Sequence, residues 1–133
     1  MFSRSLSYCS VEMSASAQEF ELLLQGKLID FVRICTYRST EDQGLLYEIG
    51  RSELGRIMTQ DPAGLSQLNE IKDGIPCSTA AHYLLLVSGV PIKYETDDEM
   101  YLWDNFGKLA YASGLKWGGD LSGRRKDRTL VYK

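Results

Sequence analysis

The stretch Ile34-Cys35-Thr36-Tyr37-Arg38-Ser39-Thr40-Glu41-Asp42-Gln43 organises the chain. It begins as a β-branched and aromatic run, which is typical of a buried strand, and then changes into a helical pattern. Thr40 and Gln43 have the spacing of a capping box, and Ser39 is an equally good N-cap. The stretch therefore predicts a strand that delivers Arg38 to its own end, where a helix begins.

Helical and strand-like patterns alternate along the rest of the chain. Helices are predicted from Ser14 or Ser16 to residue 25, at 40–49 with apolar Leu45, Leu46 and Ile49, and from Asp97 or Asp98 to residue 114. Strands are predicted at residues 31–37, 80–87, 90–94 and 129–132. Residues 50–77 hold many turn-forming residues, which is typical of a functional or flexible loop. The pattern predicts one small α+β domain over residues 1–133, with an antiparallel sheet and flanking helices.

Composition narrows the classes of function. The 133 residues suffice for a single core, and the net charge of −3 gives no reason to expect a nucleic-acid partner. No apolar run is long enough to cross a membrane, and residues 1–9 lack the apolar centre of a secretory signal. Cys9, Cys35 and Cys77 are odd in number and widely spaced, which favours reduced thiols over a disulfide framework. We therefore expect a cytoplasmic protein.

Charge is unevenly distributed along the sequence. Residues 95–99 are mostly acidic, whereas Arg124, Arg125, Lys126 and Arg128 form a basic cluster near the C-terminus. A charge run of this length is either a solvated loop or a patch that binds a partner. The basic cluster is therefore the candidate for partner binding.

Several separated motifs follow one another along nearly the whole chain. They are Ser-Arg-Ser-Leu at 3–6, Cys-Thr-Tyr-Arg-Ser at 35–39 with Gln43 and Tyr47, the segment 50–59, Gly-x-Ser-x-x-Asn at 64–69, and Gly-Leu-Lys-Trp-Gly-Gly-Asp at 114–120. In these motifs and their order the chain resembles the zinc D-alanyl-D-alanine carboxypeptidase and L-alanyl-D-glutamate endopeptidase family. The VanY-like branch of this family is used by many bacteriophages as endolysins.

The resemblance implies a small LAS-type metallopeptidase-like fold with a zinc ion held by a histidine, an aspartate and a second histidine. Three protein ligands leave the fourth zinc position to a water molecule, whose pKa the metal lowers towards neutrality. The resemblance also implies an acidic catalytic residue three positions before the last histidine, where this chain has Asp127. It further implies an arginine that steadies the substrate, at Arg38.

All three positions that the resemblance assigns to zinc ligands are changed in this chain. They are occupied by Leu68, His82 and Leu130, which we call the three ligand positions. Leucine has no lone pair to donate, so zinc, which the family requires, is expected to be lost, and no cofactor is expected. His82 is interpreted as an imidazole satisfied by a backbone partner, or alternatively as part of a new metal site with Cys77, Asp73 and Asp127. We expect the two leucines to form a small hydrophobic core, which would stabilise the domain by about 1.5–3 kcal/mol for each fully buried side chain.

The rest of the peptidase pocket is predicted to survive, but no residue of it is assigned a catalytic role. Its residual members are Arg38, Gln43, Ser66, Asn69, Trp117 and Asp127. Each also has a structural interpretation: Trp117 as core, Gln43 as a helix cap, and Asp127 as a partner of the neighbouring arginines. Arg38 itself is either a pocket cation or a surface arginine paired with a carboxylate of residues 41–42.

Three functions follow as hypotheses. The first is a catalytically inactive phage-type peptidase homologue that binds a protein partner. The class of partner suggested by this hypothesis is a host defence component such as a CRISPR complex. The second is a peptidoglycan peptidase, of the endolysin type, with a rearranged or deliberately inactivated zinc site. The third is a non-catalytic cell-wall module in which Arg38 holds the carboxylate of a peptidoglycan peptide.

Overall fold

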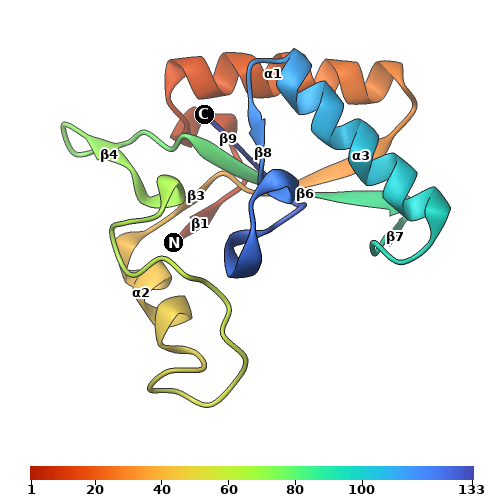
Figure 1. Ribbon diagram of the computed structural model, residues 1–133. Helices are drawn as coiled ribbons and strands as arrows, with labels where there is room; N and C mark the ends of the chain where they lie inside the picture. Colours follow the sequence, from red (N-terminus) through yellow and green to blue (C-terminus); the bar gives the residue numbers. More distant parts are fainter.

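A computed structural model describes residues 1–133. Its main body is a five-stranded sheet in which every recorded pairing is antiparallel, with the order β2-β6-β9-β8 and β7 paired to β6. The strands are β2 (Asp30–Cys35), β6 (Ala80–Val87), β7 (Val90–Pro91), β8 (Lys116–Trp117) and β9 (Leu130–Tyr132). Helices α1 (Val11–Gly26) and α3 (Asp97–Ala112) lie together on one side of this sheet (Figure 1). The small single-domain α+β class predicted from the sequence is confirmed.

Smaller elements complete the chain. They are the paired strands β1 (Phe2–Ser3) and β3 (Tyr37–Arg38), helix α2 (Thr40–Glu48), the hairpin β4 (Ile71–Lys72) and β5 (Ile75–Pro76), and short 3₁₀ turns at Leu6–Tyr8, Gln67–Asn69, Gly118–Asp120 and Gly123–Arg125. Helix α2 and the loop after it project away from the sheet. No helix in the chain has both the length and the apolar character needed to cross a bilayer.

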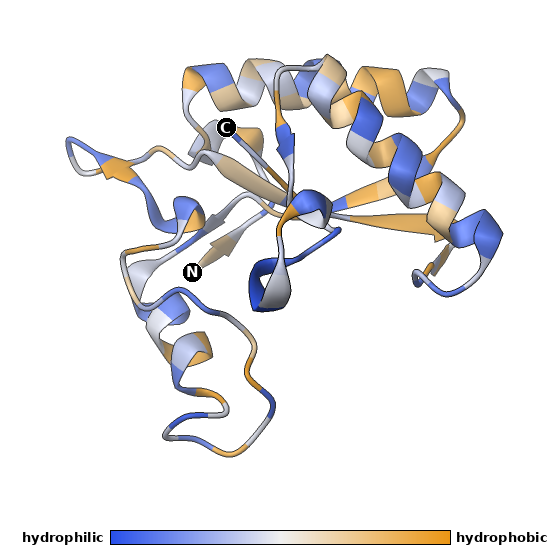
Figure 2. Cartoon of the chain, viewed as in Figure 1, coloured by the Kyte–Doolittle hydropathy of each residue, from blue (hydrophilic) through white to orange (hydrophobic).

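The main core lies between the sheet and the two long helices. Side chains alternate along β6, so that Ala81, Tyr83 and Leu85 are buried against α1 and α3. Phe106 of α3 meets Phe20 of α1 edge-on, with ring centroids 4.9 Å apart. Figure 2 shows the hydrophobic colouring along β6 that this burial requires. Because β6 contacts both helices through one face, its other face is available to build a site.

The ends of the long helices differ from the prediction because side-chain caps decide them. Helix α1 begins at Val11, several residues before the predicted start, since the Ser10 side chain accepts a hydrogen bond from the Met13 backbone. Helix α3 begins after Thr96 rather than after Asp97 or Asp98, and Thr96 forms a capping box with Glu99.

The strand predicted over residues 31–37 is divided in two. Strand β2 ends at Cys35, and β3 resumes at Tyr37 in a different sheet, where it pairs with β1. Between them Thr36 is fully buried, and its hydroxyl donates a hydrogen bond of 2.6 Å to the Ser5 carbonyl. This contact between distant parts of the sequence turns the chain away from the main sheet. The predicted strand 90–94 is likewise shortened, to Val90–Pro91.

Candidate functional site

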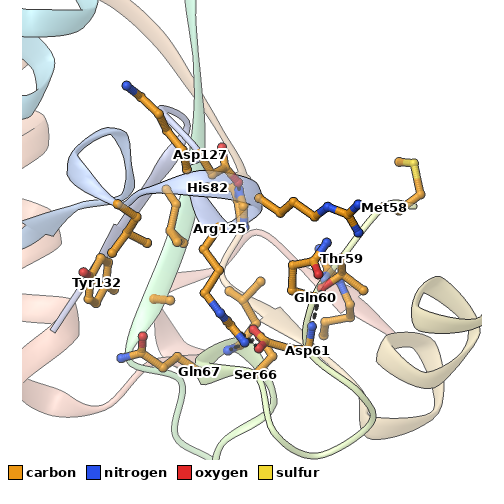
Figure 3. Close-up of a pocket in the computed structure, with 17 residues that line it drawn as sticks. Met58, Thr59, Gln60, Asp61, Ser66, Gln67, His82, Arg125, Asp127 and Tyr132 are labelled. Carbon is orange, nitrogen blue, oxygen red and sulfur yellow. Dashed lines mark hydrogen bonds and ion pairs between the residues drawn. The ribbon is translucent and has the colours of Figure 1, made fainter. Parts of the chain in front are cut away.

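A pocket of about 430 Å³ opens on the face of β6 opposite the main core. We call it the basic pocket. It contains all three ligand positions together with Arg38, Ser66 and Asp127 of the residual site, and Arg124, Arg125 and Lys126 of the basic cluster; its other lining residues are Met58, Thr59, Gln60, Asp61, Gln67, Ala80, Leu121 and Tyr132. The close-up in Figure 3 shows how segments far apart in the sequence surround it. Most of the residues singled out from the sequence therefore meet in one place.

The floor of the basic pocket is apolar. Leu68 is 2% exposed and forms a small core with Cys35 and Ala80, against which Leu130 and Tyr132 pack. The expected small hydrophobic core at Leu68 and Leu130 is therefore present.

His82 occupies the second of the three ligand positions and lies directly opposite Leu130 in the sheet. Its Nδ1 lies 2.9 Å from the Thr129 hydroxyl oxygen and 3.5 Å from Asp127 Oδ2. Because the Thr129 hydroxyl donates to Asp127 Oδ1 at 2.6 Å, that hydroxyl accepts the hydrogen from His82 Nδ1. The expected backbone partner of His82 is thus replaced by a side chain. Asp127 is held by this Thr129 and His82 network rather than by the neighbouring arginines.

Burial lowers the pKa of His82, and the positive charge of Arg38 lowers it further, although Asp127 opposes both effects. The folded state therefore binds this proton less well than the unfolded chain, whose imidazole titrates near 6.5. It follows that the His82 contribution to stability is present above about pH 6.5 and is lost as the pH falls from there. We expect urea midpoints measured between pH 7.5 and 5 to decline, and the decline to be shallower in His82→Asn. Equal slopes for both proteins would contradict this sign.

The donor set at this place does not fit zinc. Two of the three ligand positions are leucines, and Nδ1 of His82 is engaged by Thr129. No group of three or more His, Cys, Asp or Glu side chains in the chain is arranged to hold a metal ion. The alternative metal site of His82, Cys77, Asp73 and Asp127 is therefore not assembled in this structure.

Arg38 lies at the end of β3, as the opening stretch predicts, and lines the basic pocket. Its Nη1 donates to Gln43 Oε1 at 2.7 Å, which is a neutral acceptor. The structure contains no ion pair of Arg38 with a carboxylate, and its Nε is buried without a hydrogen-bond partner. The alternative of a surface arginine paired with residues 41–42 is therefore wrong. Asp42 pairs with the Met1 amino group instead.

Two members of the predicted pocket, Asn69 and Gln43, do not line it but form hydrogen bonds to residues that do. Asn69 is almost fully buried, and its Nδ2 donates to the Arg38 carbonyl at 2.6 Å. Gln43 is fully buried, and its Nε2 donates to the Asp61 carbonyl at 2.6 Å and to Thr59 Oγ1 at 3.1 Å. Its capping role is not observed, because Ser39 is the N-cap of α2. The two amides thus position Arg38 and the loop that faces it.

Gln43 is also the only buried side chain of α2. Of the apolar residues at helical spacing in α2, Leu45 is 62% exposed, whereas Leu46 and Ile49 are half-buried. We expect Gln43→Ala to loosen α2 and the loop after it while the main core stays folded, because each buried partner left unsatisfied costs about 1–3 kcal/mol. Hydrogen exchange should rise locally over residues 40–61 and stay unchanged in β6. Leu45→Ala, on the exposed side, is the matched control and should change neither region.

Trp117 lies in the main core and does not line the pocket. It is 8% exposed, and its Nε1 donates to the Arg128 carbonyl at 2.8 Å. A Cβ added to Gly107 or Gly119 would stand 2.3 Å from its ring, so both glycines are needed for the indole to fit. The core interpretation of Trp117 is therefore confirmed. Its predicted place in the residual pocket is not observed, because Trp117 is not among the residues that line the pocket.

The basic cluster divides between two locations. Arg124, Arg125 and Lys126 line the pocket, and Arg125 Nη1 lies 2.8 Å from Asp61 Oδ1 (Figure 3). This ion pair joins the two loops that face each other across the pocket. Arg128 lies outside the pocket lining, with its guanidinium carbon 4.6 Å from the centroid of the Tyr94 ring.

Several lining residues are not among the candidate site residues predicted from the sequence. Met58, Thr59, Asp61, Leu121 and Tyr132 line the pocket, and the first four lie outside helices and strands. Tyr132 belongs to β9, whose alternation with buried Val131 would indicate that it faces away from the main core. The loop residues reach the pocket only through tertiary contacts such as those of Gln43.

A scan against models of protein families finds no match to this chain, and a search of curated proteins finds none either. The resemblance to the zinc peptidases therefore rests on the sequence motifs alone.

Proposed function

We propose that this chain is a catalytically inactive homologue of phage-type zinc peptidases and acts by binding a protein partner. The observation that carries the proposal is the replacement of the three ligand positions by Leu68, His82 and Leu130, which converge on one pocket. A site with leucine at two of the three ligand positions lacks the donors that hold zinc and so cannot activate a zinc-bound water. A pocket without that chemistry still offers shape, charge and apolar surface for recognition.

Surface features beside the pocket support a binding role. The loop after α2 exposes large apolar side chains, with Leu54 fully exposed and Met58 63% exposed. Figure 2 shows hydrophobic stretches along this projecting loop. Contiguous exposed apolar surface beside a charged rim is typical of a protein interaction site. We propose the pocket and this loop as the face that meets the partner.

The place of action that we propose is the cytoplasm, which is the host cytoplasm if a phage encodes the chain. Three free cysteines suit a reducing compartment. A host defence component is then a suitable class of partner.

Muropeptide hydrolysis tests the loss of catalysis. The purified chain, supplied with equimolar zinc, is incubated with soluble muropeptides that contain L-alanyl-D-glutamate and D-alanyl-D-alanine bonds, and the products are followed by chromatography. We expect no cleavage above the blank. Zinc-dependent cleavage that a chelator abolishes would establish the endolysin-like peptidase and overturn the proposal.

A second candidate function is the cell-wall peptide-binding module, which the unpaired guanidinium of Arg38 favours. An Arg in a pocket without a carboxylate partner can hold the carboxylate of a peptide through charge-assisted hydrogen bonds. Retention of the chain on purified peptidoglycan sacculi, lost in Arg38→Ala and kept in Arg4→Ala, would support this function. Absence of retention would remove it.

A further inference from the structure

We infer that the basic pocket receives an acidic segment of the protein partner. One apolar side chain of that segment packs against Leu130 on the pocket floor, and its carboxylates meet Arg38 and the rim formed by Arg124, Arg125 and Lys126. This inference rests on the proposed function and names the chemistry of the partner.

The charge of the lining indicates the sign of the ligand. Four basic side chains and two carboxylates line the pocket. The lining therefore carries more positive than negative charge, although the net charge of the whole chain is −3. A local excess of one sign in a concave site raises the concentration of ligands of the opposite sign.

The state of Arg38 shows where a carboxylate is missing. Its guanidinium contacts a neutral amide, has no ionic partner, and leaves a buried Nε without an acceptor. Charged groups taken out of water are normally paired, because their desolvation is otherwise uncompensated. A carboxylate of the ligand at this place would supply the absent counter-charge.

The ion pair across the pocket is exposed enough to exchange partners. The side chains of Arg125 and Asp61 are 59% and 31% exposed, and pairs with this exposure contribute little, typically about 0–1 kcal/mol. A carboxylate from the partner can therefore replace Asp61 on Arg125 at little cost. The chain supplies its own acidic side chain at the position where we place the acidic segment.

The apolar floor of the pocket indicates that the ligand carries an apolar side chain as well as carboxylates. Leu68, Ala80 and Leu130 line the bottom of the pocket, and Leu121 and Met58 lie in other parts of its lining. The volume of about 430 Å³ lies within the range of about 300–1,000 Å³ for ligand sites. It accommodates an apolar side chain together with neighbouring acidic residues of an extended segment.

Panning of a displayed library of random dodecapeptides against the whole chain tests the inference. We expect the enriched peptides to carry Asp or Glu beside Leu, Ile or Met. An enriched peptide, synthesised with a fluorescent label, should bind about tenfold or more weakly to Arg124→Glu/Arg125→Glu and to Leu130→Gln. Lys27→Glu/Lys108→Glu changes the same number of charges at exposed positions outside the pocket, one directly after α1 and one in α3, and should leave the affinity unchanged.

The variant Asp61→Asn gives an effect of the opposite sign, which unfolding cannot imitate. It releases Arg125 and should tighten binding of the acidic peptide by about threefold, with the gain reduced at high salt. The inference would be overturned if the enriched peptides were neutral or basic, or if the selection enriched no peptide. It would also be overturned if neither pocket variant changed the affinity of the enriched peptide. Tighter binding of a muropeptide or of a phosphorylated oligonucleotide at the same pocket would also overturn it.

Failure of the inference is distinguishable from failure of the proposed function. Zinc-dependent muropeptide cleavage would overturn the inactive-homologue proposal, whatever peptides are enriched. Loss of the acidic preference without cleavage would overturn only the chemistry assigned here to the partner.

Discussion

The variant Leu68→His/His82→Asp/Leu130→His is expected to bind one zinc ion per chain. Positions 82 and 130 are direct neighbours across β6 and β9, and Leu68 and Leu130 pack within one small core. Two imidazoles and a carboxylate introduced there would supply the donors that zinc takes in catalytic sites. Native mass spectrometry with equimolar zinc should show one bound ion. Zinc at a hundred times its dissociation constant should stabilise the fold by about 2.7 kcal/mol.

The control for this variant is Leu68→Gln/Leu130→Gln, which changes the polarity of the floor without adding zinc-binding imidazoles. It should bind no stoichiometric zinc and should melt at the same temperature with and without the metal. A triple variant that folds, as judged by circular dichroism, and still binds no zinc would contradict the assignment of the three ligand positions.

Trp117→Ala is expected to cost about 3–5 kcal/mol of unfolding free energy, the usual penalty for emptying a large aromatic site in a core. Trp117 belongs to the main core, and its Nε1 hydrogen bond to the Arg128 carbonyl ties the start of β9 to β8. Small domains have a total stability of about 5–15 kcal/mol, so this one change removes a large share of it. Urea denaturation measures the loss.

Trp117→Phe is the matched comparison for this substitution. It keeps an aromatic ring against Gly107 and Gly119 but removes the hydrogen bond to the Arg128 carbonyl, so its cost should be clearly smaller. If Trp117→Ala were as stable as the unchanged protein, the tryptophan would not be part of the core. The alternative prediction from the sequence, that Trp117 belongs to the residual pocket, would then be favoured.

The sequence predicts the elements of the main body well where local signals and packing agree. The apolar run at residues 80–87 is observed as β6, and the helical spacing of Trp103, Phe106 and Ala110 corresponds to the buried face of α3. These patterns carry their own period, so tertiary contacts strengthen what the local sequence already favours.

Prediction fails where distant contacts override the local pattern. The run over residues 31–37 is continuous in sequence, yet the Thr36 hydroxyl bonds to the carbonyls of Ser3 and Ser5 and divides it. Helix α2 has apolar residues at helical spacing, yet a polar network around Gln43 holds it in place. Neither contact can be inferred from a window of neighbouring residues.

The candidate site could be predicted in part for the same reason. His82 and Leu130 meet in one pocket because they are paired across β6 and β9, and Asp127 comes three residues before Leu130. Arg38 at the end of β3 and Leu68 in the 3₁₀ turn Gln67–Asn69 reach the same pocket through tertiary contacts. The opposite wall of the pocket, around Asp61, is formed by a loop whose sequence shows neither helical nor strand periodicity, so its position could not be predicted.

A zinc titration of the unchanged protein, followed by native mass spectrometry after purification without chelator, tests the central claim most directly. The proposed loss of the zinc site predicts a cooperatively folded chain that carries no stoichiometric zinc at an equimolar supply of the metal. One tightly held zinc ion per chain would contradict it, because His82 would then have recruited ligands that the present arrangement does not provide.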